Sequence, residues 1–174
     1  ILTNSQLKKF KTMFSKKIKV IDCTFDTKNT LRNRIEEIRE EAEIAVRGGA
    51  NHLILSDQNI SEERAIVPMI LAVGAIHSYL VKLSLRGYAS LNAQTAEAMD
   101  THSFAVLIGV GATTVNPYLA IDSIFQRYEK KLFGELDFAS CVERFKKSIN
   151  AGLLKIMSKM GISVLSSYRG GCNF

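Results

Sequence analysis

HLILSD, at positions 52–57 of this 174-residue chain, is the stretch that decides the fold class. A continuous apolar run that is closed by polar residues is typical of a strand buried on both faces of a parallel sheet. Apolar residues at helical spacing lie on both sides of it, over 30–47 and 64–86. The first of these predicted helices has one apolar stripe and ends at Gly48 and Gly49. A buried strand between two helices predicts an α/β fold.

The alternation of strand and helix continues along the chain. Further strands are predicted over 18–25, 89–95, 112–117 and 162–168. Further helices are predicted over 3–15, from Asp100 or Thr101 to Ile108, and over 119–133 and 138–159. Each gap between strands is long enough for a parallel crossover. The chain falls short of the eight strands of a (β/α)8 barrel. We therefore expect an incomplete, barrel-like, mainly parallel sheet with flanking helices.

Composition and charge exclude several classes of protein. Hydrophobic residues make up 47% of the chain and charged residues 23%, which is typical of a folded globular protein. No apolar run reaches the roughly 20 residues that cross a bilayer, and the N-terminus lacks the pattern of a signal peptide. We therefore predict a cytoplasmic protein without a membrane partner. The net charge is +6, but the lysines are dispersed and Trp is absent, so solvated helix faces are favoured over a nucleic-acid surface.

The cysteines and histidines give no sign of a metal site. They are Cys23, Cys141, Cys172, His52, His77 and His102. The cysteines form no CxxC pair, and the histidines share no metal-binding spacing. We expect Cys23 and Cys141 to be small buried hydrophobic residues and the histidines to pack or to cap helices.

Polar residues gather where the predicted strands end, which is where α/β sheets bind ligands. They are Asp57, Asn92 to Thr95, Asn116 and Ser166 to Arg169. Asp57 could act as a general base, but capping of the loop that follows it is favoured. Arg169, followed by two glycines, suits a phosphate or a dicarboxylate as well as it suits an acid elsewhere in the protein. No Ser/His/Asp constellation can be assembled, so no catalytic residue is predicted.

Gly109-Val110-Gly111 has two of the glycines of a dinucleotide-binding loop. It lacks the third glycine and follows a predicted helix instead of a strand. We therefore predict a tight turn from helix to strand.

Five stretches together resemble one enzyme family, the large chain of glutamate synthase. They are DCTFD (22–26), EEAEIAVRGGANHLILSDQNI (40–60), AVGAIHSYLV (72–81), HSFAVLIGVGATTVNPYLA (102–120) and NAGLLKIMSKMGISVLSSYRGG (150–171). The first four resemble the central domain of that chain. The last resembles the junction that leads into its flavin domain.

The resemblance implies a multidomain enzyme that makes L-glutamate. In that family an amidotransferase domain splits glutamine, and the ammonia travels to an FMN-bearing (β/α)8 barrel, where it meets 2-oxoglutarate. The 2-iminoglutarate is reduced with electrons that arrive through an iron–sulfur cluster from NADPH, NADH or ferredoxin. The central domain is an α/β relative of the flavin barrel and connects the two sites.

The resemblance also implies a domain boundary and a set of site residues. Residues 1–157 would be the central domain, and 158–174 the first strand and loop of the FMN-binding barrel. Six residues would lie at the edge of the FMN and 2-oxoglutarate site: Lys159, Met160, Gly161, Ser163, Ser167 and Arg169. The chain ends in Gly-Cys-Asn-Phe, where the family more often has Gly-Ala-Gln.

Three hypotheses about function follow. In the first, the chain is a structural connector and ammonia conduit, inactive alone and without a cofactor of its own. Its partners are then the glutaminase and FMN domains of the parent chain and an electron-donating subunit or ferredoxin. In the second, it is a stand-alone module that holds a small anion at its strand ends without catalysis. In the third, incomplete barrels associate into a small FMN enzyme.

Overall fold

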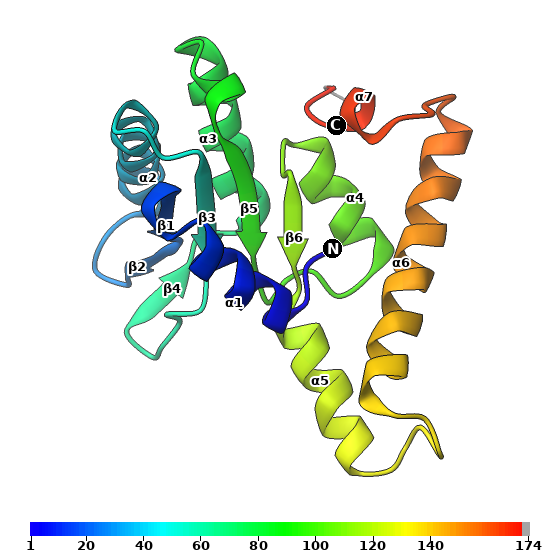
Figure 1. Ribbon diagram of the computed structural model, residues 1–174. Helices are drawn as coiled ribbons and strands as arrows, with labels where there is room; N and C mark the ends of the chain where they lie inside the picture. Colours follow the sequence, from blue (N-terminus) through cyan, green and yellow to red (C-terminus); the bar gives the residue numbers. More distant parts are fainter. Residues whose placement is uncertain (172–174) are drawn as a thin grey trace.

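A four-stranded parallel sheet forms the centre of the computed structural model, which describes residues 1–171 (Figure 1). Its strands are β1 (Ile18–Asp22), β3 (His52–Ser56), β5 (Ser90–Gln94) and β6 (Thr114–Asn116). Their order in the sheet, β1-β3-β5-β6, follows their order in the chain. Neighbouring strands of a (β/α)8 barrel are arranged in the same way. The predicted α/β class with a mainly parallel, barrel-like sheet is confirmed.

Three helices cover one face of this sheet: α2 (Leu31–Arg47), α3 (Met69–Lys82) and α4 (Thr101–Gly109). The strand side chains that point toward them are apolar and fully buried, as Leu53 and Leu55 of β3 show. They form one core with the apolar stripes of the helices. Burial of this kind stabilises the fold by about 25 cal/mol per Å² of apolar surface.

The other face of the sheet is mainly polar, although Ile54 of β3 lies on it, and it meets the N-terminal helix α1 (Asn4–Met13). Because side chains alternate along a strand, the residues between the core positions of β3 and β5 point this way. The rings of Phe10 and Phe14 pack on the imidazole of His52, with centroids 4.8 and 4.6 Å away. The backbone N–H of Leu2 donates to Val115 of β6, which fixes the chain beside this edge strand.

Helices α5 (Tyr118–Glu129) and α6 (Phe138–Lys159) form a hairpin that reaches beyond the sheet (Figure 1). Its upper part is held to the body by packing of α6 on α4. Two 3-10 turns, η1 (Ser15–Lys17) and η2 (Arg86–Tyr88), precede β1 and β5.

The predicted strand over 162–168 is wrong. This segment turns after α6 and forms one helical turn, α7 (Leu165–Tyr168). Among the residues that the structure describes, no strand lies beside it to supply ladder hydrogen bonds. It is anchored instead by the buried ring of Tyr168 and by the backbone N–H of Gly170, which donates to Gly109 at 2.9 Å.

The predicted helix over 64–86 begins later than expected. Its first residues form β4 (Arg64–Ile66), which pairs antiparallel with β2 (Thr24–Asp26). Pro68 disfavours a helical conformation at the residue before it, so α3 begins only at Met69. The single strand predicted over 18–25 is in fact two strands, β1 and β2, which are separated at Cys23.

Candidate functional site at the carboxyl edge of the sheet

Polar side chains lie at the carboxyl ends of all four parallel strands. We call five of them the edge cluster: Asp22, Asp57, Thr95, Asn116 and Tyr118. Asp57, Thr95 and Asn116 are almost completely buried, with exposed fractions of 1%, 0% and 1%. Buried polar groups need hydrogen-bond partners, so each of these side chains has a defined position.

Asp57 is the centre of the edge cluster. Its carboxylate accepts hydrogen bonds from the Thr95 hydroxyl at 2.6 Å and from the backbone N–H of Ala96 at 3.0 Å. The phenol of Tyr118 lies against the same carboxylate. Burial, and then the hydrogen bond to Asp57, raise the pKa of Tyr118, so the phenol stays neutral at physiological pH. The prediction that Asp57 caps the loop that follows it is wrong, because its carboxylate instead caps the loop after β5.

Asn116 connects the edge cluster to the N-terminal segment. Its amide nitrogen donates to the Leu2 carbonyl at 3.0 Å and to Asn4 Oδ1 at 2.9 Å. Asn4 in turn donates to Asp122 at 3.0 Å. The Oδ1 atom of Asn116 is buried and has no hydrogen-bond partner among the described residues.

A cleft of about 580 Å³ opens beside this contact, between the start of α1 and the α5–α6 hairpin. Asn4 and Asp122, which link to Asn116, are part of its wall. Phe125 and Phe138 contribute its apolar side, and their ring centroids are 5.3 Å apart. A chain of polar contacts therefore runs from this cleft to the edge cluster.

The polar face of the sheet continues away from the edge cluster. The Lys11 ammonium donates to Gln94 Oε1 at 3.0 Å, and burial lowers the pKa of Lys11. Further along, Thr114 donates to Asn92 Oδ1 at 2.8 Å. His52 and Ser90 share a hydrogen bond of 2.7 Å. The polar side chains of this face are thus held by hydrogen bonds to one another or to α1.

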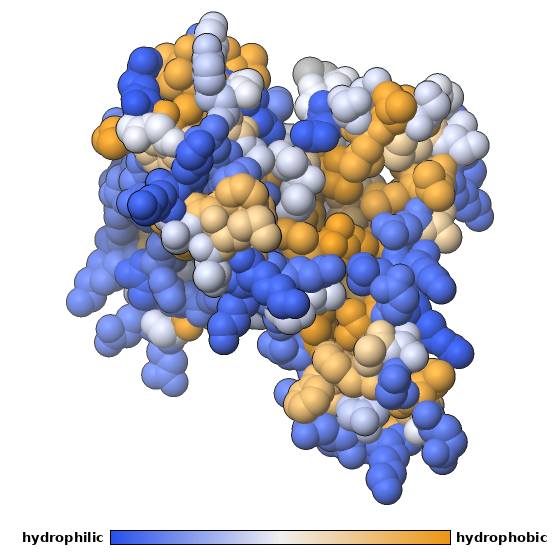
Figure 2. Space-filling model, viewed as in Figure 1, coloured by the Kyte–Doolittle hydropathy of each residue, from blue (hydrophilic) through white to orange (hydrophobic). Residues whose placement is uncertain are grey.

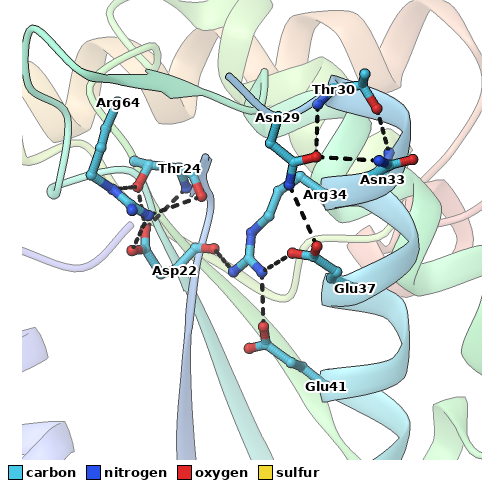
Figure 3. Close-up of polar contacts among 9 residues, drawn as sticks. All are labelled: Asp22, Thr24, Asn29, Thr30, Asn33, Arg34, Glu37, Glu41 and Arg64. Atoms are coloured by element: carbon cyan, nitrogen blue, oxygen red, sulfur yellow. Dashed lines mark hydrogen bonds and ion pairs between the residues drawn. The ribbon is translucent and has the colours of Figure 1, made fainter. Parts of the chain in front are cut away.

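Asp22, at the end of β1, joins the parallel sheet to the small antiparallel one (Figure 3). Its carboxylate accepts from the backbone N–H and the hydroxyl of Thr24 at 2.9 and 2.8 Å, and from Arg64 at 3.0 Å. Asn59 adds a fourth hydrogen bond at 3.0 Å. Burial acts to raise the pKa of Asp22, but the hydrogen bonds from Asn59 and Thr24 and the charge of Arg64 outweigh it and hold this pKa below its usual value.

Arg34 ties the same strand end to α2 (Figure 3). Its guanidinium donates to the Asp22 carbonyl at 2.7 Å, to Glu37 at 2.7 Å and to Glu41 at 3.0 Å. Sequence reasoning identified neither this contact nor the Asp22–Arg64 pair. Asp22 lies inside the predicted strand over 18–25, so no local pattern marked it as a site residue.

The six residues that the sequence predicts at the edge of the flavin site lie away from the edge cluster. Lys159, Met160 and Gly161 are exposed where α6 ends, and Ser163 and Ser167 are exposed beyond it. Arg169 is half-buried near the end of α4. Because α4 ends where β6 begins, this is the amino side of the sheet, opposite the edge cluster (Figure 1). The prediction that Ser166 to Arg169 follow a strand is wrong.

These six side chains do not form a cradle for FMN within the described residues. Five of them are exposed to solvent, so no enclosed wall surrounds a bound flavin. Their place at the edge of a flavin site in a longer enzyme stays a prediction. We derive no chemical step through that cofactor.

The cysteine and glycine predictions agree with the structure. Cys23 and Cys141 are buried, and burial raises the pKa of the Cys23 thiol to about 12, which leaves it inert at neutral pH. Cys172 lies outside the described residues. Gly111 has φ +125° in a turn between α4 and β6, so the predicted tight turn is confirmed.

Residues 1–171 contain neither a candidate metal site nor a candidate membrane span. No group of three or more His, Cys, Asp or Glu side chains there could hold a metal ion. Among the helices of the same residues, none has the length and apolar character needed to cross a membrane.

Comparisons with known proteins all indicate the same family. The protein-family model of the glutamate synthase central domain matches residues 1–174 of this chain. The glutamate synthase (NADPH) large chain of Azospirillum brasilense is 50% identical, with 100% of this chain and 12% of that protein covered. The corresponding large chain of Bacillus subtilis is 38% identical, with 98% and 11% covered. The chloroplastic ferredoxin-dependent glutamate synthase of Spinacia oleracea is 39% identical, with 86% and 10% covered. The chain thus spans about a tenth of the length of these relatives.

Proposed function

This chain belongs to the glutamate synthase central-domain family, and on that premise we propose that it is the structural connector and ammonia conduit of a glutamate synthase. The whole enzyme would make L-glutamate by reductive amination of 2-oxoglutarate with ammonia from glutamine. The chain alone would have no catalytic activity and would hold no cofactor.

The edge cluster is the observation that carries this proposal. Ammonia is a small molecule that both donates and accepts hydrogen bonds, so a path for it needs polar, mostly neutral groups shielded from bulk water. Thr95, Tyr118 and Asn116 are such groups, and the Asn116 oxygen is a buried acceptor that has no partner within residues 1–171. The cleft beside Asn4 and Asp122 is a reasonable point of entry, because its wall is bonded to Asn116.

The inactivity of the isolated chain is supported by the character of its polar groups. The Thr95 hydroxyl is bonded to the Asp57 carboxylate, but both side chains are buried, with exposed fractions of 0% and 1%, so a substrate does not reach this pair. The thiol of Cys23 is held protonated by burial. Each carboxylate is occupied by hydrogen bonds that position backbone loops, as for Asp22 and Asp57. Such groups organise a fold and a path, and the chemistry would belong to the neighbouring domains.

The proposed partners are the glutaminase and FMN domains of the parent chain. Figure 2 shows apolar surface at the end of the molecule where α6 and α7 meet. Leu154, Met160, Val164 and Leu165 are exposed there, by 66%, 44%, 52% and 38%. Apolar surface of this kind favours packing against a following domain, and we propose the boundary at residues 157–158. The six predicted residues from Lys159 to Arg169 would then contribute to the edge of the FMN and 2-oxoglutarate site.

The choice of electron donor would be determined by parts of the enzyme outside this chain. A relative that is named for NADPH and one that is named for ferredoxin have 38% and 39% identity to it. An iron–sulfur cluster would likewise be held elsewhere in the enzyme. A cytoplasmic location remains our proposal, and the relative from Spinacia oleracea is described as chloroplastic.

The experiment that tests the conduit uses a full-length glutamate synthase that contains this chain. Thr95→Val and Tyr118→Phe each remove one hydroxyl from the edge cluster while keeping the shape of the side chain. We expect both variants to release free ammonia during glutamine turnover, so that less glutamate forms per glutamine hydrolysed. Synthesis from added ammonia should change less than synthesis from glutamine.

Arg144→Gln is the matched control, because Arg144 is exposed on α6 and outside every ion pair of the described residues. It should leave the ratio of glutamate to hydrolysed glutamine unchanged. If the two edge variants keep the wild-type ratio while remaining folded, the conduit proposal is wrong.

A further inference from the structure

A cluster of basic groups lies on the amino side of the sheet, away from the edge cluster. Arg86, in η2, donates to the carbonyls of Ala89 and Gly111 and to Nδ1 of His77, the last at 3.0 Å. All three acceptors are neutral. The positive charge of Arg86 is therefore hydrogen-bonded, but no acidic side chain of residues 1–171 forms an ion pair with it.

The hydrogen bond from Arg86 also sets the tautomer of His77. Since Nδ1 accepts, the ring proton of the neutral imidazole lies on Nε2. Nε2 faces the C-terminal turn, because a Cβ built on Gly170 would lie 2.8 Å from it. Gly170 has φ +66°, and its N–H bonds to Gly109, so the turn is fixed in this position.

Arg169 brings a second guanidinium to the same place. Its Nε atom is buried and has no hydrogen-bond partner among the described residues. Burial, and then the nearby charges of Arg86 and Arg169, lower the pKa of His77. No ion pair of the described residues includes Arg86 or Arg169. Two partly buried positive charges without a counter-charge are unfavourable unless an anion joins them.

We propose that Arg169, Arg86 and His77 form a binding site for a small oxyanion, with inorganic phosphate as its representative. Two guanidinium groups match the double charge of phosphate, and guanidinium N–H groups fit its oxygens in pairs. His77 supplies a neutral N–H donor from Nε2. The buried Nε–H of Arg169 gains the acceptor that it lacks. This site lies at the opposite edge of the sheet from the proposed conduit and does not depend on it. It is formed within this chain and does not require the flavin site, to whose edge Arg169 is also proposed to contribute.

The test is a titration of the 174-residue chain with inorganic phosphate at constant ionic strength, with chloride as the balancing salt. The NMR signals of the Nε–H groups of Arg86 and Arg169 report binding. We expect both signals to shift in a saturable manner with one dissociation constant. Shifts that do not saturate, or that chloride reproduces, would overturn the proposal.

Arg169→Gln should weaken phosphate binding about tenfold or more, because it removes a charge-assisted contact. Arg127→Gln is the control, since Arg127 is exposed in α5, at the opposite end of the molecule from α7 (Figure 1). Its phosphate affinity should equal that of the wild type. Phosphate should also raise the thermal midpoint of the wild type more than that of Arg169→Gln. Equal phosphate affinity in Arg169→Gln and Arg127→Gln would contradict the assignment. If Arg169→Gln does not fold, Arg169→Lys repeats the test, and we expect its phosphate affinity to be intermediate.

Discussion

Gly152, within α6, faces Thr101, the first residue of α4, so closely that a Cβ added to Gly152 would lie 2.5 Å from the Thr101 Cγ2 atom. The glycine lets the two helices approach at this point, and α6 packs on the body of the domain through α4. The α5–α6 hairpin, which forms one wall of the cleft beside Asn4, depends on this contact for its position.

Gly152→Ala should therefore destabilise the fold. Alanine gains about 1 kcal/mol in helix propensity, but forcing a methyl group into a filled contact costs about 1–3 kcal/mol. Thr101 is β-branched and has little freedom to move away. We expect a net loss in the free energy of unfolding, measured with urea. Thr101→Ala in the same chain should recover part of the loss, whereas a stabilised single variant would show that the helices are not in contact here.

Arg64→Met tests the link between the two sheets. It removes the donors to Asp22 and Thr24 while keeping most of the apolar stem. Because the pair is partly exposed, we expect a loss of about 1 kcal/mol or less in global stability. The amides of β4 should lose more protection from hydrogen exchange than those of β3. Equal loss in both strands would indicate that Arg64 does not act locally.

The decrease in the free energy of unfolding at acidic pH should depend on Asp22. Its pKa in the folded state lies below the unfolded value of about 3.9. Ionised Asp22 therefore stabilises the fold above that pH, and this contribution is lost as the pH falls through the folded-state pKa.

Asp22→Asn should accordingly be less stable than the wild type at neutral pH, with the difference shrinking as the pH falls below 4 or so. Urea unfolding at a series of pH values measures this. Glu129→Gln is the control, because Glu129 is exposed in α5 and outside every ion pair of the described residues. A constant difference between Asp22→Asn and the wild type at all pH values would refute the argument.

Tyr168→Ala should release the C-terminal turn. The ring of Tyr168 is 2% exposed, and deletion of a buried aromatic ring costs about 3–5 kcal/mol in a well-packed core. We expect a smaller global loss than this, because α7 is short and lies at the end of the described chain. The amide of Gly170, which is bonded to Gly109, should exchange much faster in the variant. Unchanged protection of that amide would mean that the ring does not hold the turn.

The sequence was sufficient where one local pattern dictates the structure. The centre of HLILSD, Leu53 to Leu55, is apolar on both faces, and a central parallel strand buries both, so β3 and the α/β class could be predicted. Asp57 could be identified as a capping residue from its place after that strand. The loop that it caps belongs to a strand 39 residues away along the chain, which no local pattern reveals.

The failures of prediction arise where distant segments decide the structure. Residues 162–168 have the composition of a strand, but strand formation needs a neighbour, and contacts with Gly109 and the core favour a helical turn instead. Arg64 and Asp22 are 42 residues apart and meet only because β2 and β4 pair. Arg86 and Arg169 likewise converge through the packing of the C-terminal turn on His77.

We propose that this chain connects active sites and has none of its own. The most direct measurement combines two assays on the purified 174-residue chain: retention of FMN after desalting, and release of ammonia from glutamine. We predict that no flavin remains bound and that glutamine is not hydrolysed above the rate without protein. One flavin retained per chain, or steady glutamine turnover, would contradict the account.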